Sequence, residues 1–323
     1  MAHVPDILTA EQFRRDRLDL FWWFVCERQT IWHKRVVEHR PPPWTDNLVM
    51  QRERFTNMYR ELDPGTQYVI REILERDAPK PDKIFNVMLY RLIGRAETHA
   101  AVGFQWLDRF DPAALERGLK RLRDEEGKPP FTAAYMVSAY ASMGSRDKIE
   151  NVVKLFTLLH ASFDGFYARI AAATHPSQVY TILASAHGFG NFLAYQVLVD
   201  LLYPLDVYDG RPLLPFSHND WSAAGPGARR GIRMLLRDDA TDARGSRPDD
   251  LTVMRWLREH QRAEFTRLGL DFPYLRDTSG MERELSLANI QNCLCEFHKF
   301  VKIGEGTGRG RRKFAAEAAR TLA

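Results

Sequence analysis

The stretch Thr9–Val37, TAEQFRRDRLDLFWWFVCERQTIWHKRVV, places apolar side chains at the spacing of an α-helix. Phe13, Leu20 and Phe24 recur at roughly helical intervals, which is typical of a helix with one buried face. The run Pro41–Pro43 follows, and consecutive prolines do not continue a helix. The sequence therefore predicts one long opening helix over about residues 9–37.

The same helical periodicity extends through most of the chain. Signals for strands are few, and neither a βαβ alternation nor a glycine-rich phosphate loop after a strand is found. These observations exclude a doubly wound nucleotide-binding fold and predict an all-α protein. We expect further helices at 47–62, 66–76, 81–98, 112–124, 146–161, 165–173, 177–185, 191–203, 227–236, 250–268 and 285–302.

Composition limits the class of protein. The chain has 323 residues, of which 45% are hydrophobic and 27% charged, as in globular proteins. No apolar run is long enough for a membrane span, and the first residues lack the apolar core of a signal peptide. We therefore expect a cytoplasmic protein with no membrane partner. The net charge of +4 permits a polyanionic partner without requiring one.

The three cysteines indicate reduced thiols. Cys293 and Cys295 are too close in sequence for a framework disulfide, and Cys26 has no obvious partner. No paired CxxC motif is present, so neither a metal site nor a cofactor is expected.

Two segments have the composition of loops. Residues 237–250 are polar and mixed in charge, which suits an exposed loop or linker. Residues 304–323 begin with glycines and carry Arg311, Arg312 and Lys313. This tail is either a flexible basic arm that lies along DNA phosphates or an ordinary solvated terminus.

The segment at 184–202, ASAHGFGNFLAYQVLVDLL, predicts two helices joined by a short turn. Gly188 and Gly190 allow positive φ there, so the amides near Asn191 can approach an anion such as a DNA phosphate. The pattern resembles the hairpin of helix-hairpin-helix DNA glycosylases, which implies DNA contacts from His187, Gly188, Gly190 and Asn191. The alternative is a plain turn between helices, capped by glycines.

The first helix and the following segment contain candidate site residues. Glu27 is a candidate base and Arg28 a candidate phosphate ligand, although intrahelical ion pairs are the alternative. In FTNMYRELD at 55–63, Asn57, Arg60 and Asp63 lie on successive turns if the helix continues. Asn57 and Arg60 suit a pyrimidine edge and a phosphate, and Asp63 suits a catalytic carboxylate. Asp63 otherwise caps the next helix.

The string AGPGARRG at 224–231 predicts a tight turn that opens a helix. Gly225 and Gly227 flank a proline, and Arg229 and Arg230 follow in the first turn. Free amides and two guanidinium groups at a helix N-terminus form a seat for a phosphate or pyrophosphate. Asp220, just upstream, is the favoured candidate base; its alternative role is to neutralise an arginine.

The string QNCLCEFHK at 291–299 is the fourth candidate. Asn292, Cys295, Glu296 and Lys299 share a helix face, and Gln291 and Asn292 suit hydrogen bonds to a uracil. Glu296 suits a base and Lys299 a phosphate ligand, or the two form an ordinary ion pair. Cys295 is either a nucleophile toward the pyrimidine ring or an inert core residue.

Taken together, the strings at 21–32, 43–63, 219–231 and 291–299 resemble one family. It is the α-glutamyl/putrescinyl thymine pyrophosphorylase family, whose helical domain also occurs in 5-hydroxymethyl-deoxyuridine DNA kinases. The resemblance spans about residues 15–302 and implies one helical catalytic domain over 1–303. In one respect the chain departs from the family pattern, because Pro64 follows Asp63 where a basic residue is more usual.

The resemblance implies a transferase of thymine hypermodification, in bacteriophages and some bacteria. Such an enzyme flips the modified base out of DNA and replaces the pyrophosphate of 5-(pyrophosphoryloxymethyl)uracil with an amino acid or polyamine. No kinase phosphate loop is found in this chain, so an upstream DNA kinase is an expected pathway partner. The alternatives are a helix-hairpin-helix DNA glycosylase that acts on a modified pyrimidine and a non-catalytic DNA-binding helical module.

Overall fold

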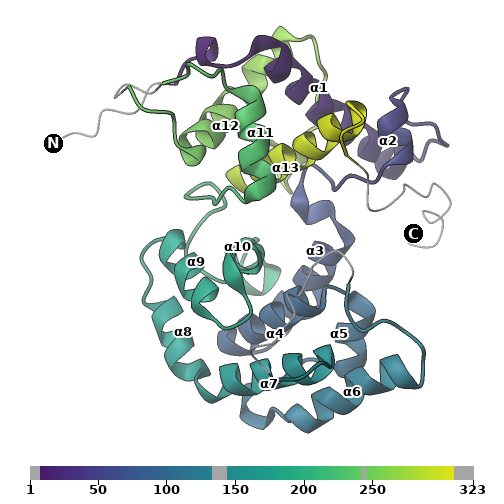
Figure 1. Cartoon of the computed structure of the whole chain (residues 1–323), viewed down its shortest axis with the longest axis vertical. Helices are drawn as coiled ribbons and strands as arrows, with labels where there is room; N and C mark the ends of the chain where they lie inside the picture. Colours follow the sequence, from purple (N-terminus) through teal and green to yellow (C-terminus); the bar gives the residue numbers. More distant parts are fainter. Residues whose placement is uncertain (1–7, 133–143, 242–244, 309–323) are drawn as a thin grey trace. The chain divides into compact units, whose positions relative to one another are not determined.

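The structure is a computed structural model, and it describes residues 8–132, 144–241 and 245–308. The α-helices are α1 Arg15–Trp32, α2 Leu48–Arg52, α3 Pro64–Tyr68, α4 Lys80–Ile93, α5 Ala96–Val102, α6 Pro112–Asp124, α7 Lys148–Ala161, α8 Phe163–Ala171, α9 Pro176–Ser185, α10 Gly190–Asp200, α11 Pro226–Leu235, α12 Asp250–Arg267 and α13 Leu287–Gly304 (Figure 1). π-Helical turns at His33–Val37 and Val69–Leu74 extend α1 and α3. Two short strands, β1 Leu275–Arg276 and β2 Glu282–Arg283, form an antiparallel hairpin. The expected all-α class is confirmed.

Most predicted helices lie close to their expected positions, but two expectations for the first 63 residues are wrong. The opening helix starts at Arg15, because Ala10–Gln12 form a 3-10 turn and Phe13 pairs as an isolated bridge with Leu236. The predicted helix over 47–62 is a helix only at α2, and a second 3-10 turn follows at Arg60–Leu62. Between them the chain leaves the helix because side chains of α13 bind its backbone, as described below.

The chain divides into two compact units, where the sequence suggested a single helical domain over 1–303. The first unit comprises residues 1–63 and 222–323, and the second comprises residues 64–221. Each unit has its own helices, and the two are described separately.

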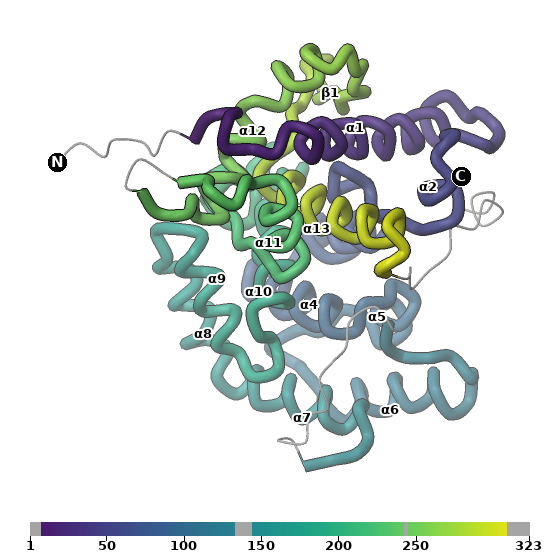
Figure 2. The backbone as a smooth tube through the Cα atoms, turned by 45° about the horizontal axis from the view of Figure 1, so that its top comes forward, coloured from purple at the N-terminus to yellow at the C-terminus, as the bar shows by residue number. Residues whose placement is uncertain are grey.

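The first unit is built around α1, α11, α12 and α13. Figures 1 and 2 show α1 beside α13 and α11 crossing α13. Aromatic side chains fill the interior: Phe21 lies edge-on to Phe297, with ring centroids 5.4 Å apart, and Trp22 packs on Phe265. Burial of these large side chains is the main stabilising contribution to a unit of this kind. The described residues between α11 and α12, within the predicted loop at 237–250, form no helix.

The second unit surrounds α4. Every residue of α4 from Asp82 to Ile93 is buried, which is typical of a helix enclosed by its neighbours. Gly94 ends the helix with φ of 67°, so the predicted helix over 81–98 is divided into α4 and α5. α9 and α10 pack against each other after a short turn (Figure 2).

A buried histidine in the second unit should make this protein sensitive to acid. His99 is 2% exposed, and its Nδ1 lies 3.0 Å from the hydroxyl of Tyr68. Burial lowers the pKa of His99 to about 4, and the charge of Arg76 lowers it further. The folded unit therefore keeps His99 neutral while the unfolded chain protonates it below about pH 6.5. Stability is expected to fall by roughly 3 kcal/mol as the pH drops from 6.5 to 4.

Urea denaturation of wild type and His99→Phe between pH 7 and pH 4 checks this expectation. The variant keeps an aromatic ring beside Tyr68 and Tyr90 but removes the titrating group. Asp63 titrates in the same range with the opposite sign, so the useful quantity is the difference between the two proteins at each pH. Parallel loss of stability in both proteins would rule out His99 as the cause.

Candidate functional site

A polar face of α13 binds the backbone of the segment 53–63, which we call the strap. Asn289 Oδ1 accepts a hydrogen bond from the amide of Arg60 at 3.0 Å. Asn292 Nδ2 donates to the carbonyl of Asn57 at 2.8 Å, and Glu296 Oε2 accepts from the amide of Thr56 at 3.0 Å. Because side chains satisfy these backbone groups, residues 54–59 of the strap remain ordered without helical hydrogen bonds.

Several residues of α13 that the sequence singled out contact the strap. Lys299 donates to the carbonyl of Arg54 and pairs with Glu296 at 3.2 Å, and its ammonium lies 4.6 Å from the centre of the Phe55 ring. Asn292, Glu296 and Lys299 therefore hold the strap. Asn289 belongs to the same face and was not predicted, although its position one turn before Asn292 is a signal that could have indicated it.

Three predicted site residues meet inside the first unit. Arg28 Nη2 donates to Asn57 Oδ1 at 2.7 Å and to the carbonyl of Phe55 at 3.2 Å. Asp63 Oδ1 accepts from the side chain of Asn57 at 3.1 Å and from its backbone amide at 3.0 Å. Arg28 and Asn57 are each 8% exposed. The sequence predicted that Asn57, Arg60 and Asp63 converge on successive turns of one helix. Arg28, Asn57 and Asp63 meet instead through a strap that leaves the helix after α2.

The side chain of Asn57 links a guanidinium group to a carboxylate, because both the oxygen and the nitrogen of its amide form hydrogen bonds. Its Oδ1 is bound by Arg28, and its Nδ2 is bound by Asp63 and by the carbonyl of Leu62. A side chain whose donors and acceptor are engaged in this way positions its neighbours. Both of its N–H groups are engaged, so only the second lone pair of Oδ1 remains for the pyrimidine edge that the sequence suggested.

Burial raises the pKa of Asp63 to about 6, with the negative charge of Glu296 acting in the same direction. The hydrogen bond from Asn57 and the charges of Arg28 and Arg60 limit the increase. Among the described residues, no hydrogen bond reaches Asp63 Oδ2, and that oxygen is not sealed from solvent. Asp63 is therefore a carboxylate with one fixed and one available oxygen, which titrates close to neutral pH.

Positive charge accumulates around this network. Burial lowers the pKa of Arg28 to about 10; Asp63 and Glu296 oppose the decrease and Arg35 and Arg54 contribute to it, and Arg28 stays protonated at neutral pH. The pKa of Arg35 is lowered by burial and by Arg54. Within the described ranges, the exposed side chain of Arg54 pairs with no carboxylate. Positive charge therefore gathers around Arg28, and the charges that act on Asp63 are those of Arg28, Arg60 and the negative Glu296.

The glycines of the AGPGARRG string bring α11 onto α13. A Cβ at Gly227 would lie 2.4 Å from Cys295 Sγ, and one at Gly231 would lie 2.4 Å from the carbonyl oxygen of Leu294. Both positions therefore require glycine for close packing. Burial raises the pKa of Cys295 to about 11, so its thiol is protonated at neutral pH. These observations favour the packing role of Cys295 over the role of a nucleophile.

The arginines of this string and the favoured base belong to different units. Arg229 pairs with Asp250 at 3.0 Å, while Arg230 is exposed and lies near Cys295. Asp220 belongs to the second unit, where its exposed carboxylate accepts from the amide of Ser217 at 2.8 Å. Asp220 therefore closes a local turn.

The remaining predicted residues have simpler surroundings. Glu27 is half-buried on α1, and in the part of the chain that the structure describes it makes neither a hydrogen bond nor an ion pair. Between α9 and α10, Gly188 and Gly190 have φ of 80° and 53°, and Phe189 is buried. The side chains of His187 and Asn191 are exposed on this turn. Arg311, Arg312 and Lys313 lie outside the described residues.

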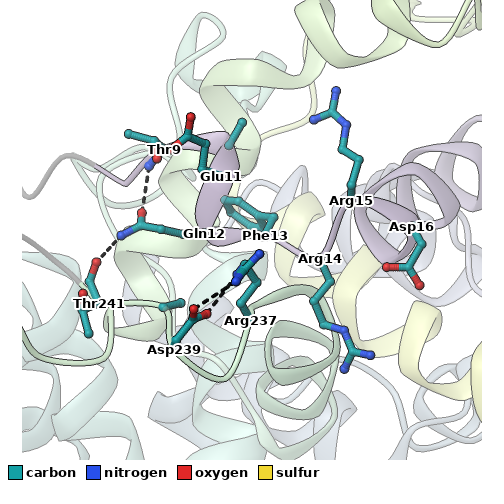
Figure 3. Close-up of a pocket in the computed structure, with 12 residues that line it drawn as sticks. Thr9, Glu11, Gln12, Phe13, Arg14, Arg15, Asp16, Arg237, Asp239 and Thr241 are labelled. Atoms are coloured by element: carbon teal, nitrogen blue, oxygen red, sulfur yellow. Dashed lines mark hydrogen bonds and ion pairs between the residues drawn. The ribbon is translucent and has the colours of Figure 1, made fainter.

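A surface groove in the first unit contains none of the predicted site residues. It is lined by Thr9–Asp16 and by residues 237 and 239–241, as Figure 3 shows. Arg237 and Asp239 pair with each other at 2.9 Å, and Gln12 bonds the carbonyl of Thr241 (Figure 3). These groups bind one another and thereby attach the segment after α11 to the start of the chain.

No helix in the described part of the chain is long and apolar enough to cross a membrane. Over the same residues, no three His, Cys, Asp or Glu side chains gather as metal ligands would.

Comparisons with known proteins identify the family. The 5-hmdU DNA kinase helical domain matches residues 15–309. A 5-hmdU DNA kinase of Bacillus phage SP10 is 27% identical over 293 residues, which cover 87% of this chain and 44% of that protein. The chain thus spans less than half the length of this relative. No solved structure matches. The matched region includes α1, the strap, α11 and α13, and the chain belongs to the family of 5-hmdU DNA kinase helical domains.

Proposed function

We propose that this chain is a transferase of thymine hypermodification in bacteriophage DNA. Its substrate is DNA that carries 5-(pyrophosphoryloxymethyl)uracil, and the pyrophosphate is replaced by an amino acid or a polyamine. Family membership supports the pathway, because the relative is named for a kinase of 5-hydroxymethyl-deoxyuridine in DNA. An upstream DNA kinase would then supply the phosphorylated base.

The observation that carries this proposal is the Arg28–Asn57–Asp63 network in surroundings of excess positive charge. Displacement of pyrophosphate needs a base for the incoming amine and cations for the departing anion. Asp63 has an available oxygen and a pKa of about 6, so it is mostly ionised at neutral pH. Arg28 and Arg60 supply positive charge to Asp63, and Arg35 and Arg54 add positive charge around Arg28.

In the proposed reaction, a lone pair of the amine attacks the methylene carbon attached to the pyrimidine ring. The carbon–oxygen bond breaks, its electrons leave with the pyrophosphate, and Asp63 takes the proton of the amine. Asn57 and Arg28 act as positioning residues, because Asn57 holds Asp63 Oδ1 and Arg28 holds Asn57, while Oδ2 faces the amine. Much of the acceleration would come from alignment of amine and methylene carbon.

Contacts with DNA are part of the proposal. The turn between α9 and α10 combines two glycines of positive φ with exposed His187 and Asn191, which suits a contact with a backbone phosphate. Base flipping would present the modified pyrimidine to the reacting groups. Arg311, Arg312 and Lys313 add positive charge to the end of the chain.

One experiment tests the function. Purified protein is incubated with DNA containing 5-(pyrophosphoryloxymethyl)uracil and a mixture of amino acids and polyamines, and the digested nucleosides are analysed by mass spectrometry. The expected result is a nucleoside heavier than 5-hydroxymethyl-deoxyuridine by the transferred group, together with released pyrophosphate. Release of free base with abasic sites would instead show a glycosylase, and binding without any new nucleoside would show a DNA-binding module.

A further inference from the structure

The first turn of α11 presents hydrogen-bond donors. Gly225 is the N-cap, and no side chain caps this end of the helix. Pro226 has no amide hydrogen, and the amide of Arg229 already bonds the carbonyl of Gly225 at 2.9 Å. The amides of Gly227 and Ala228 therefore have no helical acceptor, and the positive end of the helix dipole lies beside them.

A buried glutamine of α13 is directed at the same helix end. A Cβ at Gly225 would lie 3.9 Å from Gln291 Nε2. Gln291 is 7% exposed, and among the described residues its side chain has no hydrogen-bond partner. Since its polar atoms are not sealed from solvent, a ligand can bind them.

The packing of α11 on α13 fixes this arrangement. Gly227 and Gly231 allow the two helices to approach so closely that a Cβ at either position would overlap α13. The helix end and the amide of Gln291 are thus held on two rigid elements, as a preformed site requires.

The charge around this helix end favours an anion. Arg230 is exposed, and within the described ranges it forms no ion pair. Burial lowers the pKa of His298, and the positive charges of Arg230 and Lys302 lower it further. Helix N-termini repel cations and attract oxyanions, and the amide of Gln291 supplies one more donor.

We propose that Gln291 and the first turn of α11, with Arg230 nearby, form a seat for a phosphoryl oxyanion. The inference rests on the proposed function, in which two such groups occur: the pyrophosphate that leaves and the phosphates of the DNA backbone. Both present oxygen acceptors, which the amides of Gly227, Ala228 and Gln291 can bind.

Binding measurements test the seat without turnover. Isothermal titration calorimetry is carried out with inorganic pyrophosphate and, separately, with a short unmodified single-stranded oligonucleotide. Gln291→Glu keeps the shape but replaces the amide donor with a negative charge, and we expect at least tenfold weaker binding. Gln291→Leu removes the donor without adding charge, and a smaller loss is expected. Circular dichroism and thermal melting verify the fold of each variant.

A matched control uses the same helix. Arg233→Gln removes an exposed charge near the other end of α11, and it should leave affinity within about twofold, whereas Arg230→Gln should weaken it. Loss of pyrophosphate binding in Gln291→Glu assigns the seat to the leaving group, and loss restricted to the oligonucleotide assigns it to DNA phosphate. Wild-type affinity of Gln291→Glu for both probes overturns the seat, as does a wild type that binds neither.

The binding test of the seat and the turnover test of the proposed function can fail independently of each other. If the wild type makes the new nucleoside but Gln291→Glu binds both probes normally, the proposed seat is overturned and the transferase function stands. If the wild type binds pyrophosphate through Gln291 but forms no new nucleoside, the transferase function is overturned and the proposed seat stands.

Discussion

Asp63→Asn is expected to lower the rate of nucleoside formation by about 10²–10⁴-fold, the contribution typical of a general base. Asparagine keeps an oxygen that can accept the two hydrogen bonds from Asn57, so the strap should retain its conformation. The measurement is single-turnover formation of the modified nucleoside, followed by mass spectrometry with saturating DNA.

The dependence of this rate on pH provides a second, sharper readout. Because the pKa of Asp63 is raised to about 6, the wild-type rate should increase tenfold per pH unit below about 6 and level off above it. In Asp63→Asn this increase should be absent. A variant that retains the wild-type profile would remove Asp63 from the mechanism.

Asp63→Asn should not reduce turnover through unfolding. A carboxyl group whose pKa is raised on folding contributes stability below its unfolded pKa of about 3.8, and that contribution is lost as the pH rises through 6. At neutral pH the ionised Asp63 therefore destabilises the fold. Thermal melting at pH 7.5 should give a variant about as stable as the wild type, as is common at functional sites.

Asp220→Asn is the matched control, because Asp220 was the favoured base from the sequence. Its carboxylate is exposed and bonds the amide of Ser217 in the second unit. If Asp63 is the base, Asp220→Asn should turn over at close to the wild-type rate. The opposite outcome, an inactive Asp220→Asn with an active Asp63→Asn, would restore the assignment made from the sequence.

Asp200→Ala is expected to destabilise the second unit by about 3–5 kcal/mol, because it leaves a buried guanidinium group without a counter-ion. Both oxygens of Asp200 are bound by Nε and Nη2 of Arg91, and the side chains are 0% and 6% exposed. Arg91 Nη2 also lies 3.5 Å from Thr66 Oγ1. The pair joins α4 to α10. Urea denaturation followed by far-UV circular dichroism measures the loss.

Two comparisons make this test specific. The double variant Arg91→Met, Asp200→Leu removes both charges, and it should recover most of the stability lost in Asp200→Ala. Asp239→Ala breaks an exposed pair with Arg237 and should cost about 1 kcal/mol or less. If the double variant were as unstable as Asp200→Ala, the loss would come from packing and not from an uncompensated charge.

Most of the helical architecture could be predicted from the sequence. α6 lies at the predicted residues, and α7 to α13 lie within a few residues of them, because apolar periodicity and capping or breaking residues mark most of these helices. Asp111 and Asp249, for example, accept hydrogen bonds from the first amides of α6 and α12. Such signals are local, so they can be read without knowledge of the fold.

The segment at 47–62 could not be predicted in this way. Its periodicity indicates a helix, but Asn289, Asn292 and Glu296, more than 200 residues away in the chain, bind its backbone groups instead. A helical conformation would leave those side chains without partners in the interior. Tertiary hydrogen bonds therefore overrode local propensity, which is a frequent cause of such errors.

The sequence by itself determined the all-α class, the positions of most helices and the relation to 5-hmdU DNA kinase helical domains. It also singled out Arg28, Asn57, Asp63 and Gln291 as candidates. Only the tertiary structure decided which of them act together. Burial sets the pKa of Asp63, strap contacts occupy Asn57, and the glycines of α11 bring Gln291 to a helix end. Burial and contacts between distant segments depend on the folded chain, so no local pattern encodes them.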